Sequence, residues 1–346
     1  MHAKLKKINE IYSACKELTL HGKWISFSDI EPLLTALPKQ IQRTVVGYSE
    51  KETPISTLTL GSGAQKILIW TQMHGNESTG TKAVFDLLNY LGKVNDKEVA
   101  ALLSSCTLVF VPMLNPDGAL MYTRENALGV DLNRDALALK AKESTILRAV
   151  LEELQPAYCF NLHDQRTIFG VTGSKNPASL SFLAPSEDEE RTVTEGRKET
   201  MQAIVAMNTL LQRIIPGHIG RYTDEFYPTA TGDVFQQLGY NTILIEAGHY
   251  PGDYDREKVR EFNFHALLEG LKAIASKKTQ PYLPYFDIPN NTEMFFDRID
   301  RAEYSGLDSA YQYKDIIEDG VLVAKLEKVR EGDLSNFIGH NENEVS

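Results

Sequence analysis

Short apolar runs alternate with amphipathic segments along most of the chain, and this alternation constrains the fold more than any other feature. Lys66–Thr71, Thr107–Pro112 and Tyr158–Leu162 are apolar runs with the length of a buried strand. Between them, Thr79–Leu91 and Ala141–Leu154 carry apolar residues at helical spacing. Alternating strands and helices predict an α/β fold in which helices cover a parallel or mixed sheet.

The same criteria predict further elements and a division of the chain. We expect helices over 3–19, 28–37, 187–215 and 255–275, and strands over 43–48, 55–60, 179–184, 241–246 and 321–325. From Gln280 onward, proline punctuation and a mixed strand pattern replace the alternation. We therefore predict an N-terminal helical extension (1–40), a catalytic domain (41–279) and a C-terminal extension (280–346) in this 346-residue chain.

Composition excludes several classes of function. The formal net charge is −11 and no window gathers lysines and arginines, so we expect no nucleic-acid partner. No run of about 18 apolar residues is present and the lysine-rich N-terminus has no apolar segment behind it, so we expect neither a membrane span nor a secretory signal. Cys15, Cys106 and Cys159 form no CxxC pair, which favours free thiols and a cytoplasmic location.

Polar side chains follow the ends of four predicted strands. His74, Asn115, His163 and Glu246 each come where an apolar run stops. In open α/β sheets, ligands bind beyond the carboxyl ends of the strands. We therefore expect these side chains to lie in one crevice.

His74, Glu77 and His163 form a candidate metal site. The spacing of His74 and Glu77 lets both reach one cation from a turn that leads into a helix, although this pair alone is a weak signal. His163 at another strand end supplies a third ligand. Two histidines and one glutamate are the ligand set of one type of catalytic zinc site, which predicts one Zn²⁺ per chain. Bound zinc would lower the pKa of a coordinated water and polarise a carbonyl.

Three further residues suit a hydrolytic site that recognises a carboxylate. Arg134 offers a planar guanidinium for bidentate binding, and Asn133 beside it adds an amide donor. Glu246 ends an apolar strand, where desolvation would raise its pKa and suit it to act as a general base.

These motifs, in this order, resemble the zinc carboxypeptidase family, which includes the pancreatic carboxypeptidases. The motifs are His74-Gly-Asn-Glu77, Asn115-Pro-Asp-Gly118, Gly129-Val-Asp-Leu-Asn-Arg134, Leu162-His163 and Ile245-Glu246. The resemblance covers roughly residues 40–275. It implies a three-layer α/β/α fold around a mixed, eight-stranded sheet. The small C-terminal extension that contains strands is predicted separately, from the pattern after Gln280.

The resemblance also assigns roles to site residues. It implies that His74, Glu77 and His163 bind zinc, and that Glu246 activates the attacking water and passes its proton to the leaving amine. Arg124 would match the arginine that stabilises the oxyanion. The alternative for Arg124 is a surface ion pair with a neighbouring carboxylate.

Substrate-binding residues are implied in the same way. Asn133 and Arg134 would hold the C-terminal carboxylate of a peptide. Tyr227 would match the family's mobile tyrosine and close over the substrate, with Tyr222 and Tyr250 as nearby competitors.

The substrate class stays open between related hydrolases. The expected activity is that of a metallocarboxypeptidase, which cleaves the amide bond next to the free C-terminal carboxylate of a peptide. The compact Arg124–Arg134 segment and Leu162-His-Asp164 are also similar to bacterial members and to N-acyl amino acid deacylases of the aspartoacylase and succinylglutamate desuccinylase group. A murein-peptide amidase is a further alternative, and a binding module without activity is the alternative from another class.

Two questions about specificity and assembly follow. Either Val234 lines the side-chain pocket and favours an apolar residue, or Asp233 turns inward and favours a basic or diamino residue. The C-terminal extension would cap the sheet, restrict the cleft to small substrates or build a homo-oligomer interface.

Overall fold

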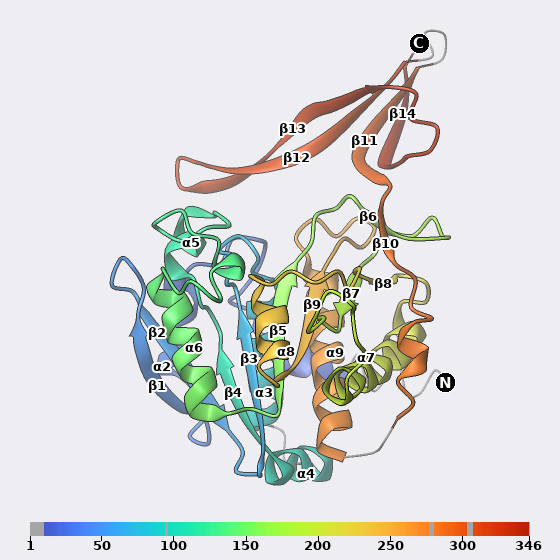
Figure 1. Ribbon diagram of the computed structural model, residues 1–346. Helices are drawn as coiled ribbons and strands as arrows, with labels where there is room; N and C mark the ends of the chain where they lie inside the picture. The colour runs from blue at the N-terminus through green and yellow to red at the C-terminus, as the bar shows by residue number, and fades with distance from the viewer. Residues whose placement is uncertain (1–9, 94–95, 277–279, 303–306, 346) are drawn as a thin grey trace.

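The computed structural model describes residues 10–93, 96–276, 280–302 and 307–345. Its centre is an eight-stranded mixed sheet, which confirms the predicted fold class (Figure 1). The strands, in the order in which they lie side by side, are β1 (Gln42–Tyr48), β2 (Pro54–Leu60), β4 (Cys106–Val111), β3 (Gln65–Thr71), β5 (Tyr158–Asp164), β9 (Asn241–Ala247), β7 (Leu180–Leu183) and β8 (Ile219–Arg221). The four central strands, β4, β3, β5 and β9, run parallel to one another, while β2 and β7 on either side of them are antiparallel to their inner neighbours.

Helices cover both faces of this sheet. They are α2 (Phe27–Thr35), α3 (Thr79–Lys93), α4 (Lys97–Ser105), α5 (Pro116–Met121), α6 (Lys142–Leu154), α7 (Glu195–Ile214), α8 (Thr231–Gln237) and α9 (Glu257–Ser276). Strand β3 shows how the two cores form, because its side chains alternate between the faces. Ile67 and Ile69 pack in the core that contains α3, α7 and α9, while Leu68 and Trp70 pack in the core that contains α6 and α8. The result is the predicted three-layer arrangement.

The predicted acidic start of the long helix is wrong. Helix α7 begins at Glu195, and the acids at 187–190 lie before it. Thr194 is the N-cap, because its side chain accepts a hydrogen bond from the backbone N–H of Arg197 at 3.2 Å. Glu187 instead accepts a hydrogen bond from the Thr194 hydroxyl at 2.6 Å. The charge run therefore belongs to a loop that is fixed by side-chain contacts.

Asn115-Pro-Asp-Gly118 forms the start of helix α5, since the Asn115 side chain caps the helix by accepting from the N–H of Gly118 at 2.9 Å. One other expectation needs adjustment. Of the helix predicted over 3–19, residues 10–15 are helical, while residues 1–9 lie outside the described part of the chain. Among the described residues, no helix is long and apolar enough to cross a membrane.

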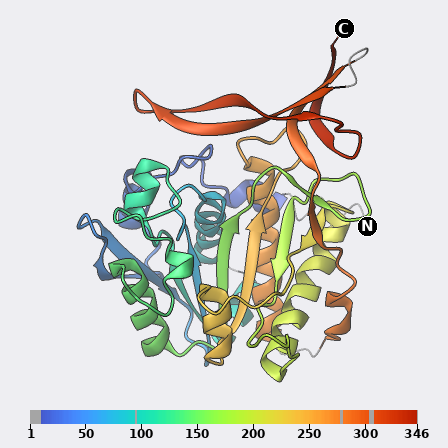
Figure 2. The ribbon, with the colours of Figure 1, turned by 45° about the horizontal axis from the view of Figure 1, so that its top comes forward.

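The end of the chain forms a separate four-stranded sheet, here called the C-terminal sheet. The chain reaches it through β10 (Asn291–Glu293), which pairs with β6 (Phe169–Val171) on the main body. Its strands, in spatial order, are β13 (Val321–Gly332), β12 (Asp308–Glu318), β11 (Phe295–Ala302) and β14 (Ile338–Val345). Figures 1 and 2 show this sheet lying across one end of the main body. The expected C-terminal extension with strands is thereby confirmed.

Candidate metal centre and active-site cleft

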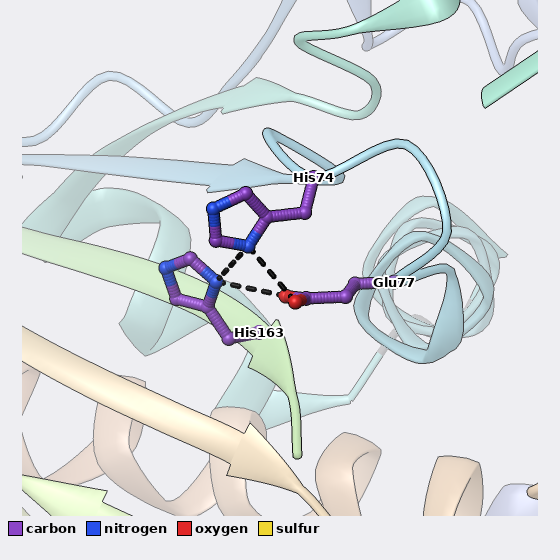
Figure 3. Close-up of side chains that lie close together, drawn as sticks. All are labelled: His74, Glu77 and His163. Atoms are coloured by element: carbon purple, nitrogen blue, oxygen red, sulfur yellow. Dashed lines mark hydrogen bonds and ion pairs between the residues drawn. The ribbon is translucent and has the colours of Figure 1, made fainter. Parts of the chain in front are cut away.

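His74, Glu77 and His163 meet at one point at the edge of the main sheet (Figure 3). Nδ1 of His74 lies 2.9 Å from Oε1 of Glu77, and Nδ1 of His163 lies 2.8 Å from Oε2 of the same carboxylate. The two Nδ1 atoms are 3.1 Å apart. All three residues are buried, and one potential ligand atom from each lies within 4.8 Å of the others.

The loop after β3 brings the first two of these side chains together. Gln72 takes a left-handed backbone conformation with φ of 50°, and its side-chain amide donates to the carbonyl of Gly75 at 2.8 Å. Gly75 packs directly on helix α5, where an added Cβ would lie 2.0 Å from the backbone of Gly118. The close approach requires glycine at position 75. The turn then returns Glu77 toward His74 just before α3 begins.

His163 and Glu246 are neighbours across two parallel strands. His163 on β5 is paired in register with Glu246 on β9, so both lie near the carboxyl ends of their strands. Glu246 lines the same cavity as the three metal-site residues. Burial raises the pKa of Glu246 well above its ordinary value, and the charges of Glu77 and Asp164 add to this effect.

The three converging groups fit a zinc ion. Burial alone would raise the pKa of Glu77, but His74 and His163 hold it well below its ordinary value, so the carboxylate is ionised. Two imidazole nitrogens at 3.1 Å have room for only one proton between them, whereas a shared cation accepts the lone pairs of both and of the carboxylate. Two imidazoles and one carboxylate are a donor set for zinc with a further position open.

Asp131 is a functional candidate that sequence analysis did not identify as part of the site. Its Oδ1 lies 3.1 Å from Nε2 of His74, the ring nitrogen that faces away from Glu77. A carboxylate on the outer nitrogen of a ligating histidine fixes its tautomer and orientation. The motif Gly129-Val-Asp-Leu-Asn-Arg134 contained this signal, but the contact depends on how the loop folds back to His74.

Arg124 joins the metal site and Asp131. Its Nε donates to Oδ2 of Asp131 at 3.0 Å, and its Nη1 lies 3.1 Å from Nδ1 of His74 and 3.3 Å from Oε1 of Glu77. The ion pair that was the alternative for Arg124 is therefore present. The same guanidinium also lies next to two of the three candidate ligands.

The predicted carboxylate-binding residues lie along the same cavity. The guanidinium of Arg134 is stacked over the ring of Tyr227, 5.7 Å from its centroid, and among the described residues it has no ion-pair partner. Oδ1 of Asn133 accepts a hydrogen bond from the N–H of Thr231 at 3.1 Å, which fixes its amide. Asn133, Arg134 and Tyr227 all line the cavity that contains Glu246.

The three candidate tyrosines differ in position. Tyr227 is 48% exposed and its hydroxyl donates to Glu225 at 3.3 Å. Tyr222 lines the same cavity, and its pKa is raised by burial and by the charge of Glu246. Tyr250 packs against His218 and is not among the described residues that line the cavity.

Asp233 and Val234 point in different directions. Val234 is buried in the core that contains α6 and α8, so it is not the residue that faces the cleft. Asp233 lines the cavity, and its Oδ1 accepts the backbone N–H of Tyr227 at 3.1 Å. Burial raises the pKa of Asp233 to about 6. The carboxylate is thus available to a ligand that binds near Arg134.

The fold and the site together define an α/β protein with a two-histidine, one-glutamate candidate metal centre. A family model described as zinc carboxypeptidase matches residues 28–179. The chain is therefore similar to the zinc carboxypeptidase family over this part of its length.

Individual relatives match only part of the chain. Carboxypeptidase 2 of Trichophyton rubrum is 30% identical over 103 residues, which is 29% of this chain and 19% of the relative. Gamma-D-glutamyl-L-diamino acid endopeptidase 1 of Lysinibacillus sphaericus is 34% identical over 98 residues, which is 26% of this chain and 24% of the relative. The match thus spans about a fifth to a quarter of the length of these curated relatives.

A solved structure extends the similarity in fold. The metallo-carboxypeptidase from Burkholderia cenocepacia superimposes with a TM-score of 0.58 at 21% identity, covering 76% of this chain and 70% of that one. At this identity the similarity concerns the fold.

Proposed function

We propose that the protein is a zinc-dependent carboxypeptidase that removes the C-terminal residue of a peptide. The observation that carries this proposal is the convergence of His74, Glu77 and His163 within 4.8 Å, in a cavity that also contains Glu246 and Arg134. Arg134 has no ion-pair partner within the described part of the chain. One zinc ion per chain is part of the proposal, with these three residues as its ligands.

The side chains around the metal site would divide the chemistry of amide hydrolysis. Bound zinc supplies an activated water and polarisation of the scissile carbonyl. Glu246, with its raised pKa, would accept a proton from the attacking water and donate it to the leaving amine. Arg124, which already lies beside His74 and Glu77, would donate hydrogen bonds to the developing oxyanion. No covalent intermediate with the protein is needed.

The part of the cavity around Arg134 would bind the C-terminal residue that is released. The guanidinium of Arg134 suits the C-terminal carboxylate, with the fixed amide of Asn133 beside it. Tyr227, stacked under Arg134, would cover this end of the substrate.

Asp233 supports a preference for a basic or diamino side chain at the position that is released. It lines the cavity, accepts the backbone N–H of Tyr227, and its charge interacts with that of Arg134. The endopeptidase of Lysinibacillus sphaericus carries a diamino acid in its name, which agrees with this preference.

A cytoplasmic location also belongs to the proposal, supported by three buried cysteines without disulfides.

A substrate panel on zinc-loaded and metal-depleted protein tests the proposed function. The panel contains N-blocked dipeptides that end in lysine, diaminopimelate or leucine, murein peptides and N-acyl amino acids. The proposal expects zinc-dependent release of the C-terminal residue, fastest for the basic or diamino peptides. Hydrolysis of N-acyl amino acids alone would identify a deacylase instead.

A further inference from the structure

The C-terminal sheet lines the same cavity as the metal-site residues. The residues that it contributes to the cavity include Phe296, Asp297, Gln312, Tyr313, Asp315 and Arg330. Figures 1 and 2 show the long β12–β13 hairpin crossing the end of the main body. We propose that this sheet is the outer wall of the active-site cleft, that it binds the acyl part of the substrate and that it limits the enzyme to short peptides. This inference rests on the proposed carboxypeptidase function.

Strands β11 and β12 are attached to the main body by charged and polar contacts. Asp315 on β12 forms an ion pair with Lys23 and accepts a hydrogen bond from the hydroxyl of Tyr122 at 3.4 Å. Asp297 on β11 accepts a hydrogen bond from the hydroxyl of Tyr254 at 3.1 Å. Each contact joins a residue of the C-terminal sheet to a different segment of the main body. The sheet is therefore held over the cavity on more than one side.

Strand β14 adds a third attachment through a stacked histidine. The ring of His340 lies between Phe295, stacked at 4.6 Å, and His249, tilted at 4.1 Å between centroids. Its Nε2 lies 2.8 Å from the carbonyl oxygen of Thr167. His249 follows Glu246 by three residues, so this attachment lies beside the catalytic strand end. The wall is thus fixed close to the reacting groups.

The C-terminal sheet meets the acyl side of a bound peptide. Arg134 and Asp233, which would hold the leaving residue, contact Asn133 and Tyr227. None of the hydrogen bonds and ion pairs between the C-terminal sheet and the rest of the described chain involves Arg134 or Asp233. Arg134 would bind the C-terminal end of the peptide. The N-terminal part, on the other side of the scissile bond, would therefore contact the C-terminal sheet.

Polar atoms without partners occur on both sides of this space. Nε2 of Gln312 and Oδ1 of Asp315 are buried in the wall, and Oδ1 of Asp164 and Nε2 of His249 are buried in the main body. None of these atoms has a hydrogen-bond partner within the described residues, and all four residues line the cavity. A buried polar group left unpaired costs roughly 1–3 kcal/mol. Donors and acceptors of this kind match the amide groups of a short peptide.

The size of the cavity gives the substrate class. Its volume is about 1120 Å³. Cavities of roughly 300–1,000 Å³ enclose most of a drug-sized ligand, so a cavity of this size has room for a short peptide. We therefore assign short peptides, and not the C-terminal tails of folded proteins, as the substrate class.

A length series tests the wall directly. The best dipeptide of the panel is extended at its N-terminus with alanine and glycine to three, four, six and ten residues, and the same sequence is placed at the end of a flexible tail on a folded protein. We expect kcat/KM to fall at least tenfold between four and ten residues and the protein tail to remain uncut. Equal kcat/KM at all lengths would overturn the inference.

A pair of variants on the same strand tests the contact with substrate. Gln312→Ala should raise KM for the tetrapeptide about tenfold and leave kcat within twofold. Lys314→Ala is the matched control, because Lys314 is 64% exposed, pairs with Glu327 and does not line the cavity. If both variants shift KM equally, or neither does, Gln312 does not bind substrate and this part of the inference is wrong.

Calorimetry tests whether the C-terminal sheet limits peptide length independently of whether the protein is a carboxypeptidase. Glu246→Gln protein loaded with zinc is titrated with the same peptides, so that binding is measured without cleavage. Affinity that falls with length, and falls further in Glu246→Gln/Gln312→Ala protein, supports the wall even if the wild type cleaves nothing. Affinity independent of length contradicts the wall even if every peptide is cleaved.

Discussion

Oδ1 of Asp131 lies 3.1 Å from Nε2 of His74, while Nδ1 of the same ring lies 2.9 Å from Glu77. The Asp131 carboxylate thus contacts Nε2 of the imidazole, while Nδ1 faces the candidate metal position. Asp131 also receives the guanidinium of Arg124, so one carboxylate orients both a metal ligand and the proposed oxyanion donor. The hydrogen bonds and nearby charges of His74 and Arg124 outweigh burial and hold the pKa of Asp131 far below its ordinary value.

Asp131→Asn should weaken zinc binding about 10-fold to 100-fold, because outer carboxylates of ligating histidines typically contribute that much. Zinc titration in competition with a chromophoric chelator measures the change. Glu125→Gln removes an exposed carboxylate from the same loop and serves as the control. Equal zinc affinity in wild type and Asp131→Asn would show that the contact does not support the metal site.

Zinc should stabilise the folded protein by roughly 2.7 kcal/mol at a free concentration 100 times its Kd, provided that it does not bind the unfolded chain. Removing His163 deletes one of three ligands, so His163→Ala should lose most of this stabilisation. Thermal unfolding with zinc, and with magnesium as a control ion, measures the difference. A similar rise in Tm with zinc for both proteins would place the ion elsewhere.

Much of this site was predictable, and the limits of prediction have physical causes. His74, Glu77, His163 and Glu246 are chemically distinctive residues at the ends of apolar runs, and parallel strands bring such ends to one edge. The role of Asp131 was not predicted, because its contact with His74 depends on the path of an irregular loop.

Contacts between distant segments account for the other differences. The position of the C-terminal sheet over the cleft depends on the pairing of β10 with β6 and on the ion pair between Lys23 and Asp315, which are separated by 292 residues. No local periodicity encodes such pairings. Asp233 faces the cleft and Val234 does not, because the orientation of α8 places Val234 in the core. The rotation of this helix about its axis could not be predicted from the sequence.

Arg134→Ala should lower kcat/KM for peptides with a free carboxylate by about 10-fold to 100-fold, mainly through KM, because a charge-assisted hydrogen bond contributes roughly 1.5–3 kcal/mol. C-terminally amidated peptides should be poor substrates for the wild type and should change little in the variant. Lys140→Ala removes an exposed cation from a neighbouring segment as a control. Unchanged discrimination between acid and amide would exclude Arg134 from carboxylate binding.

Acid should weaken the attachment of the C-terminal sheet through His249. Burial, together with the charges of His340, Arg256 and Lys23, lowers the pKa of His249 to about 2, while the unfolded value is about 6.5. Between these values the unfolded chain binds a proton that the folded chain does not, so stability falls as pH decreases below about 6.5, by at most about 1.4 kcal/mol per pH unit for this one group.

His249→Gln should therefore reduce the slope of unfolding free energy against pH between pH 4 and 6.5. Urea unfolding at a series of pH values measures this slope. His21→Gln changes an exposed histidine and should leave the slope as in wild type. If His249→Gln also keeps the wild-type slope, His249 is not buried in its neutral form.

Release of the C-terminal residue by zinc-loaded wild type and Glu246→Gln protein tests the central claim most directly. The substrate is the best N-blocked dipeptide, and the metal content of both proteins is measured in parallel. General acid and base groups typically contribute about 10²-fold to 10⁴-fold, so we predict that the variant binds one zinc per chain and is slower by roughly 10³-fold. Equal rates for the two proteins, or no release by zinc-loaded wild type, would contradict the account.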